Sequence, residues 1–186
     1  MHPILVTNLV LLWIVLMLNL LLTIALIRRF NRISTQLSAF GGMDIGLEKG
    51  SLAPDFQAET LTGETVTLAD YAQKAVSLIF ISPHCSPCLE KIPKLNALAA
   101  KAEQAGVEML LVNTDGDKAE TAAFVEKHKV TLPVLIAPSE SNSFARDYKA
   151  DATPSYCILN QDSYVEAAGV FEPNWEEQLA RAWATA

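Results

Sequence analysis

Cysteine is scarce in this 186-residue sequence, and basic residues are scarce after its first 32 positions. Three cysteines are too few for a disulfide-linked scaffold, and one close pair with one distant thiol is typical of redox chemistry. After residue 32, 11 lysines and arginines stand against 21 aspartates and glutamates. A domain this negative repels phosphate backbones, which excludes nucleic-acid binding. The length suits one domain with an appendage.

Charge is absent from the apolar run between Ile4 and Ile27. At about 1.5 Å per residue, a helix of that length spans roughly 36 Å, enough to cross a hydrocarbon core of roughly 30 Å. A signal peptide would have a basic residue before a shorter run and small residues after it, whereas this run ends in Arg28 and Arg29. A buried core helix is the alternative. We predict an uncleaved, single-pass transmembrane anchor over residues 1–27.

The arginines that follow this run, Arg28, Arg29 and Arg32, have no basic side chain other than His2 on the opposite side of the predicted span. By the positive-inside rule, this distribution favours a cytosolic C-terminal domain. Residues 28–49 hold three glycines and are of mixed polarity, so we predict a tether there. The globular domain is predicted over residues 50–186.

Apolar runs of strand length alternate with segments of helical periodicity from residue 50 onward. The run Ala75–Ser82 is continuous, as for a strand that is covered on both faces. Strands are predicted at residues 56–61, 65–68, 75–82, 107–115, 133–138, 155–162 and 164–171, and helices at 89–106, 118–130, 141–150 and 174–185. This order predicts an α/β domain with a mixed sheet flanked by helices.

Two of the cysteines, Cys85 and Cys88, stand where a predicted buried strand ends and a helix begins. The unpaired N–H groups and the dipole at a helix start favour the thiolate form of Cys85. Cys88 lies one turn further, within reach of a mixed disulfide formed at Cys85. The pattern predicts a redox-active dithiol in which Cys85 is the attacking thiol.

The sequence supports three other uses of the cysteine pair less well. A zinc site needs four ligands, and the only further candidates are Cys157 and three histidines that form no second close pair, His2, His84 and His128. A c-type haem needs histidine directly after the second cysteine, where Leu89 stands. A purely structural disulfide across so short a loop would constrain the unfolded chain little.

The chain from about Gly50 to Trp183 resembles the membrane-anchored, thioredoxin-like redoxins of the TlpA/ResA kind. The features that carry the resemblance are "GSLAPDF" at the start of the domain, a strand followed by Cys85-Ser86-Pro87-Cys88, Pro93, and "ATPSY" with Pro154 at the cis-proline position. Within that group the chain most resembles the methylamine-utilisation proteins of the MauD type, which share its anchor, its glycine-containing tether and a Ser-Pro-x-Cys-x-x-Cys motif.

This resemblance implies a thioredoxin-like fold and a thiol–disulfide oxidoreductase with no cofactor except its own redox-active disulfide, and no metal. It also implies an extracytoplasmic, periplasmic domain, against the charge argument from the arginines. The MauD likeness implies that the protein forms or isomerises disulfides in a cysteine-containing client, such as a methylamine dehydrogenase small subunit. A membrane or soluble redox partner would recycle the dithiol.

Residues outside the pair are assigned roles in the same site. Thr153 and Pro154 are expected to join through a cis peptide bond and to hold an extended substrate beside Cys85. His84, when protonated, could lower the pKa of Cys85, or it could be a solvated neighbour without a role. Pro87 is a second candidate modulator. Cys157 is expected to be a small buried hydrophobe.

The sequence leaves two other functions open. The "APDF" segment suggests a thiol peroxidase of the peroxiredoxin type, but Leu78 and Ser82 stand where its usual motif has proline and threonine. A copper-delivery protein could use the two cysteines and a histidine. Thioredoxin also carries a buried carboxylate six residues before its first cysteine, where this chain has Ile79. We therefore expect slow resolution of a mixed disulfide at Cys85, which suits an isomerase or disulfide donor.

Overall fold

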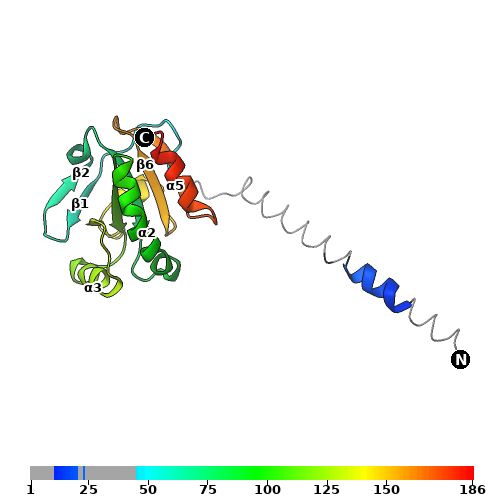
Figure 1. The fold of residues 1–186 in the computed structure, drawn as a ribbon. Helices are drawn as coiled ribbons and strands as arrows, with labels where there is room; N and C mark the ends of the chain where they lie inside the picture. The colour runs from blue at the N-terminus through cyan, green and yellow to red at the C-terminus, as the bar shows by residue number, and fades with distance from the viewer. Residues whose placement is uncertain (1–10, 21–22, 24–44) are drawn as a thin grey trace, which may run out of the picture. The chain divides into compact units, whose positions relative to one another are not determined.

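The computed structural model describes residues 11–20, 23 and 45–186, which belong to two separate units (Figure 1). Residues 11–20 are helical, and their side chains are exposed. The rest of the predicted anchor at 1–27, except Thr23, and residues 28–44 of the predicted tether lie outside the described residues. Within the described part of the chain, no helix combines the length and the apolar character that a membrane crossing requires.

A seven-stranded mixed sheet forms the centre of the C-terminal unit (Figure 1). The strands are β1 (Gln57–Thr60), β2 (Thr65–Thr67), β3 (Ala75–Ile81), β4 (Val107–Asn113), β5 (Val134–Ile136), β6 (Ser155–Leu159) and β7 (Val165–Val170). Their order across the sheet is β2-β1-β5-β4-β3-β6-β7. The β3–β4 and β4–β5 pairs are parallel and the remaining pairs are antiparallel. The predicted mixed sheet is confirmed.

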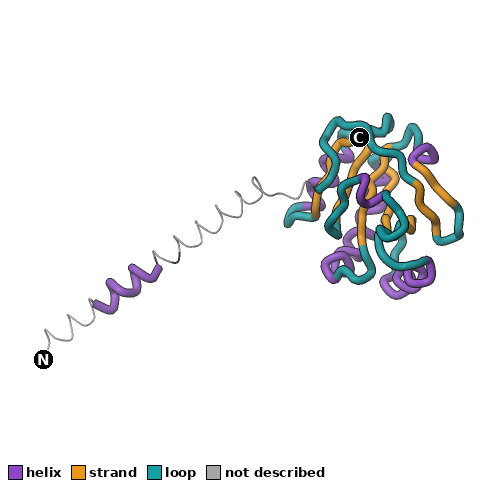
Figure 2. Tube along the Cα trace, turned by 180° about the vertical axis from the view of Figure 1, so that it is seen from behind, coloured by secondary structure: helices purple, strands orange, loops and turns teal. Residues whose placement is uncertain are grey.

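Helices cover both faces of this sheet, which Figures 1 and 2 show from opposite sides. They are α2 (Ser86–Gln104), α3 (Lys118–His128), α4 (Phe144–Asp147), α5 (Trp175–Trp183) and the 3-10 helix η1 (Leu68–Tyr71). One core cluster joins buried side chains of α2, α3 and α5 to the sheet, and a second joins α4 and η1 to the other face. The three-layer arrangement is that of a thioredoxin-like fold.

The central strand β3 is buried along its whole length. Ile79 and Ile81 belong to the cluster beneath α2, whereas Leu78 and Phe80 belong to the cluster on the α4 face. Because successive side chains of a strand point to opposite faces, a strand covered on both faces is apolar along nearly its whole length. This is why the continuous apolar run identified the strand correctly.

The main differences between the predicted and the observed helices are at three places. Helix α2 begins at Ser86, three residues earlier than predicted, because Cys85 caps it and Pro87 is tolerated in a first turn. Helix α4 has only four residues, because the Asn142 side-chain oxygen accepts the Phe144 N–H and holds the preceding segment in a turn. The short 3-10 helix η1 was not predicted at all.

Contacts of the C-terminal unit begin ahead of Gly50, inside the predicted tether. The Gly46 N–H donates to the Lys149 carbonyl at 2.9 Å, and Lys49 Nζ lies 3.2 Å from Glu166 Oε2. A Cβ atom at Gly46 would lie 2.7 Å from the Ala168 Cβ, so the close approach to β7 requires glycine there. Residues 45–49 therefore pack as part of the domain.

Candidate active site at the Cys85–Cys88 disulfide

Cys85 is the N-cap residue of α2 and follows the short loop that leaves β3. The Cys88 N–H donates to the Cys85 carbonyl at 2.9 Å and also to Cys85 Sγ at 3.3 Å, so an N–H group of the helix start is shared with this sulfur. Pro87 lies in the first turn, where its missing N–H leaves no intrahelical bond unmade. A thiolate at Cys85 would thus be stabilised by the helix start.

The two cysteines are joined in a disulfide, with Cα atoms 5.3 Å apart. Cys85 is partly exposed, whereas Cys88 is 0% exposed and packs in the apolar cluster beneath α2. An incoming sulfur can therefore reach Cys85 and not Cys88. This asymmetry supports the prediction that Cys85 is the attacking thiol.

Thr153 and Pro154 lie beside the disulfide, at the start of β6. Their peptide bond is cis, as predicted. The Thr153 carbonyl oxygen lies 3.3 Å from Cys85 Sγ. The antiparallel pairing of β6 with β3 brings these residues next to a loop that is 68 positions away in sequence. Their expected role in holding a substrate remains a prediction.

A polar cluster that the sequence did not reveal flanks the loop before Cys85. Ser82 Oγ donates to Asp115 Oδ2 at 3.1 Å and accepts the His84 backbone N–H at 3.1 Å. His84 Nε2 lies 3.9 Å from the same carboxylate oxygen. Asp115 closely follows β4, the parallel neighbour of β3, and the carboxyl ends of parallel strands meet at one edge of a sheet. That topology was the signal that could have identified Asp115.

The side chains beneath Cys88 are apolar. Ile79, which stands where thioredoxin has its carboxylate, is fully buried in the same cluster as Cys88. Ser77 lies on the same face of β3, and its hydroxyl is buried without a hydrogen-bond partner. The residue that replaces the thioredoxin carboxylate is thus an apolar side chain of the core cluster into which Cys88 packs.

The third cysteine lies on the opposite face of the sheet. Cys157 is 1% exposed and packs in the α4-side cluster, whereas Cys88 belongs to the α2-side cluster. Burial raises the pKa of the Cys157 thiol to about 12. A thiol in this environment is the small buried hydrophobe that the sequence predicted.

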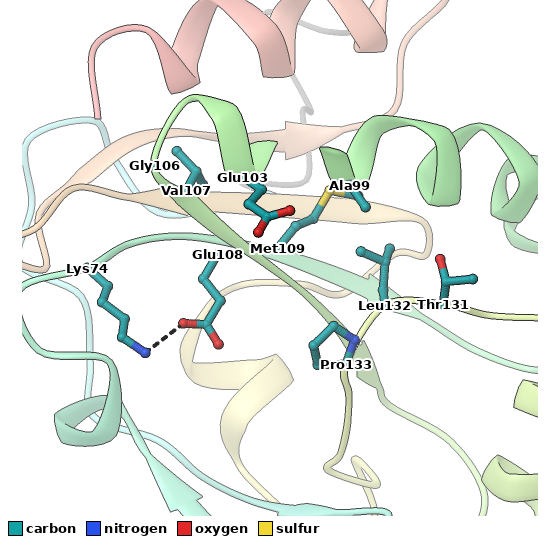
Figure 3. A pocket seen from close by; sticks show the side chains of 10 residues that line it. All are labelled: Lys74, Ala99, Glu103, Gly106, Val107, Glu108, Met109, Thr131, Leu132 and Pro133. Atoms are coloured by element: carbon teal, nitrogen blue, oxygen red, sulfur yellow. Dashed lines mark hydrogen bonds and ion pairs between the residues drawn. The ribbon is translucent and has the colours of Figure 1, made fainter. Parts of the chain in front are cut away.

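A hollow of about 440 Å³ lies at the other end of the sheet, where β3 and β4 begin (Figure 3). Lys74 and Glu108 form an ion pair at its edge, with Nζ and Oε2 2.9 Å apart. No cysteine lines it. Among the residues described here, no group of three or more histidine, cysteine, aspartate and glutamate side chains gathers as metal ligands would.

The model of the AhpC/TSA family matches residues 50–168, which include both the cysteine pair and the cis-proline. The chain belongs to the AhpC/TSA family. Among curated members of this group, it is 31% identical over 122 residues to the thiol-disulfide oxidoreductase ResA of Oceanobacillus iheyensis, a match that covers 63% of this chain and 62% of the relative. ResA of Geobacillus thermodenitrificans is 38% identical over 117 residues, covering 63% of this chain and 66% of the relative.

Solved structures with this fold include a Chlorobium tepidum protein assigned as the thiol:disulfide interchange protein DsbE. It is 28% identical to this chain, with a TM-score of 0.65, and the match covers 73% of this chain and 95% of the Chlorobium tepidum chain. The thioredoxin-like fold is thereby confirmed. Both ResA relatives are named as thiol–disulfide oxidoreductases, and the chain spans less than two thirds of the length of the Oceanobacillus iheyensis protein.

Proposed function

We propose that this AhpC/TSA-family protein is a thiol–disulfide oxidoreductase of the ResA/DsbE type. The observation that carries the proposal is the unequal environment of its two cysteines. Cys85 is partly exposed at a helix start beside the Thr153 carbonyl, while Cys88 is fully buried. An exposed sulfur that can be attacked and a buried sulfur that can resolve the product are what disulfide exchange requires.

In the oxidising direction, a client thiolate attacks Cys85 Sγ. The bond from Cys85 to the client forms, the Cys85–Cys88 bond breaks, and Cys88 leaves with the electron pair. A second client thiolate then attacks the client sulfur of the mixed disulfide and releases Cys85 as a thiolate. The Cys88 N–H, which points at this sulfur, would stabilise the departing charge. The reducing direction is the reverse of these steps.

In cells, we propose, residues 1–27 anchor the protein in the membrane and the redox domain lies outside the cytoplasm. There it would form or isomerise disulfides in a client such as a methylamine dehydrogenase small subunit, and a membrane or soluble redox partner would recycle it. The MauD-like Ser82–Cys88 motif and the uncharged N-terminal run support this more specific proposal.

The test of the activity is disulfide exchange between the purified protein and a peptide disulfide. The wild type should exchange, Cys85→Ser should be inactive, and Cys88→Ser should accumulate a mixed disulfide at Cys85 that mass spectrometry can identify. Cys157→Ser is the matched control and should retain full activity. Activity in Cys85→Ser, or a mixed disulfide at Cys88 in place of Cys85, would contradict the proposal.

Membership of the AhpC/TSA family also favours a second candidate, a thiol peroxidase. Leu78 and Ser82 stand where the usual peroxidase motif has proline and threonine. Consumption of hydrogen peroxide by the reduced protein separates the two functions. Catalytic peroxide turnover that depends on Cys85 and is faster than exchange with the peptide disulfide would favour the peroxidase.

A further inference from the structure

The loop that delivers Cys85 is attached to the end of β4 as well as to helix α2. The Thr114 N–H and hydroxyl both donate to the Ile81 carbonyl, at 2.9 and 3.0 Å. One residue further along each segment, the Ser82 hydroxyl donates to the Asp115 carboxylate at 3.1 Å. The end of β3 therefore has a fixed position relative to the end of β4.

Ser82 connects Asp115 to the backbone of the nucleophile. Its carbonyl accepts the Cys85 N–H at 3.1 Å, and its Oγ accepts the His84 N–H at 3.1 Å. Because the Ser82 hydroxyl proton is directed to Asp115, the lone pairs of Oγ are free to accept the His84 N–H. Loss of the carboxylate would allow the hydroxyl to rotate and would loosen the turn before Cys85.

Asp115 is itself held by a buried polar network. Its N–H donates to Asn113 Oδ1 at 3.3 Å, and Asn113 Nδ2 donates to Thr121 Oγ1 at 2.7 Å. Asn113 and Thr121 are both fully buried. The Asp115 backbone is therefore positioned before any substrate arrives, which is the condition for a residue that orients a reacting group.

The direct pairing of Asp115 with the His84 imidazole is the weaker of its two links. The two groups are 3.9 Å apart, with side chains 65% and 52% exposed, so solvent screens their attraction. Ser82 is only 8% exposed, and its bond to the carboxylate is charge-assisted and better shielded. The hydrogen bond to Ser82 is therefore the stronger connection between Asp115 and the loop before Cys85.

We infer that Asp115 is a positioning residue for Cys85 and acts through Ser82. The inference rests on the proposed exchange activity. In the step concerned, the Cys85 thiolate attacks a disulfide sulfur of the client. A bond from Cys85 to that sulfur forms, the client S–S bond breaks, and the other client sulfur leaves as a thiolate. The attack requires the three sulfurs to align, so the orientation of the Cys85 backbone affects its rate.

The test uses the full-length chain in detergent with Cys88→Ser as background, so that the mixed disulfide accumulates and only the attack is measured. A synthetic peptide disulfide is the probe, at a pH above the titration of Cys85. We expect Asp115→Ala and Ser82→Ala each to slow the attack about tenfold. Asp115→Asn keeps an oxygen that accepts from Ser82, so it should remain within about threefold of the parent. Asp162→Ala, an exposed aspartate in the β6–β7 turn, is the matched control and should have no effect.

Alkylation by iodoacetamide at the same pH distinguishes positioning from a general disturbance of the thiol. It reports thiolate reactivity without alignment of three sulfurs, so its rate should be unchanged in all variants. Ser82→Ala combined with Asp115→Ala should be no slower than either alone, because both remove one bond. The inference would be overturned if the two substitutions slowed the attack multiplicatively in the double variant, or if alkylation slowed as much as the attack. It would also be overturned if Asp115→Asn were as slow as Asp115→Ala. A parent that fails to attack the peptide would instead overturn the proposed function.

Discussion

Cys88 and Cys157 are equally buried, on opposite faces of one sheet, and their expected chemistry is opposite. Cys88 is 0% exposed and Cys157 is 1% exposed. Cys88 lies in the first turn of a helix and is bonded to a partner that solvent reaches, whereas Cys157 lies in the middle of β6 as the one free cysteine of the described residues. A buried thiol is therefore expected to be redox-active when it lies at a helix start and is bonded to a sulfur that solvent reaches. Burial without these two features is expected to leave a thiol inert.

The largest expected effect is on thiol reactivity. In the reduced protein, Cys85 should react with iodoacetamide with a pKa below the ordinary value of about 8.5, because the helix start stabilises its thiolate. Cys157, with a pKa of about 12, should be more than about a thousandfold slower at pH 8, since its thiolate is almost unpopulated. Mass spectrometry of the alkylated peptides measures all three cysteines. Faster labelling of Cys88 than of Cys85 would reverse the assigned roles.

A carboxylate introduced into the apolar cluster around Cys88 should make Cys88 more reactive and so increase its difference from Cys157. Ile79 is fully buried in the cluster that contains Cys88, so Ile79→Asp would supply an acceptor for the Cys88 proton. We expect resolution of a mixed disulfide at Cys85 to become about tenfold faster, less than the roughly 10²–10⁴-fold that a well-positioned base contributes, because the surrounding core is not built to orient a carboxylate. Stopped-flow measurement on the preformed mixed disulfide gives the rate.

Ile79→Asn is the matched control for that experiment, because the asparagine side chain has nearly the same shape as that of aspartate but cannot accept the Cys88 proton. Both variants should be less stable than the wild type, since each buries a polar group. Equal rates in the two variants would show that proton removal from Cys88 does not limit resolution. The preference for an isomerase or disulfide donor over a fast reductase would then lose its main support.

A third prediction concerns the inert cysteine. Cys157→Ser places a hydroxyl in the apolar cluster on the α4 side, and we expect this to lower the free energy of unfolding by about 1–3 kcal/mol. Exchange activity of the folded protein should not change, because Cys157 lies on the face away from the dithiol. Denaturant unfolding and the peptide exchange assay measure the two quantities. A loss of activity without a loss of stability would assign Cys157 a redox role.

The smallest effect concerns the segment before Gly50. A chain that begins at Asp44 and a chain that begins at Gly50 should both fold and remain in solution when membranes are sedimented. The longer chain keeps the Gly46 hydrogen bond to Lys149 and the Lys49–Glu166 ion pair, so we expect it to be about 1 kcal/mol more stable. Thermal unfolding compares them. Sedimentation of either chain with membranes would count against an anchor confined to residues 1–27.

The sequence by itself determined the local features of this protein. The run at Ala75–Ile81, apolar except for Ser77, indicated a strand buried on both faces, and Gly63, with a φ of 91°, allowed the turn between β1 and β2. The cysteine spacing placed both sulfurs on one helical turn. Each of these depends on residues close together in the chain, so periodicity and turn chemistry were enough to predict them.

Tertiary structure alone decided which distant residues share the site. Asp115 and Ser82 are 33 positions apart, and they meet only because β4 pairs in parallel with β3 in a register that aligns Ile81 with Asn113. The antiparallel pairing of β6 with β3 sets Cys157 opposite Leu78, which places Cys157 on the face away from Cys88. Strand order and register are set by the packing of the whole core, and no local pattern encodes them.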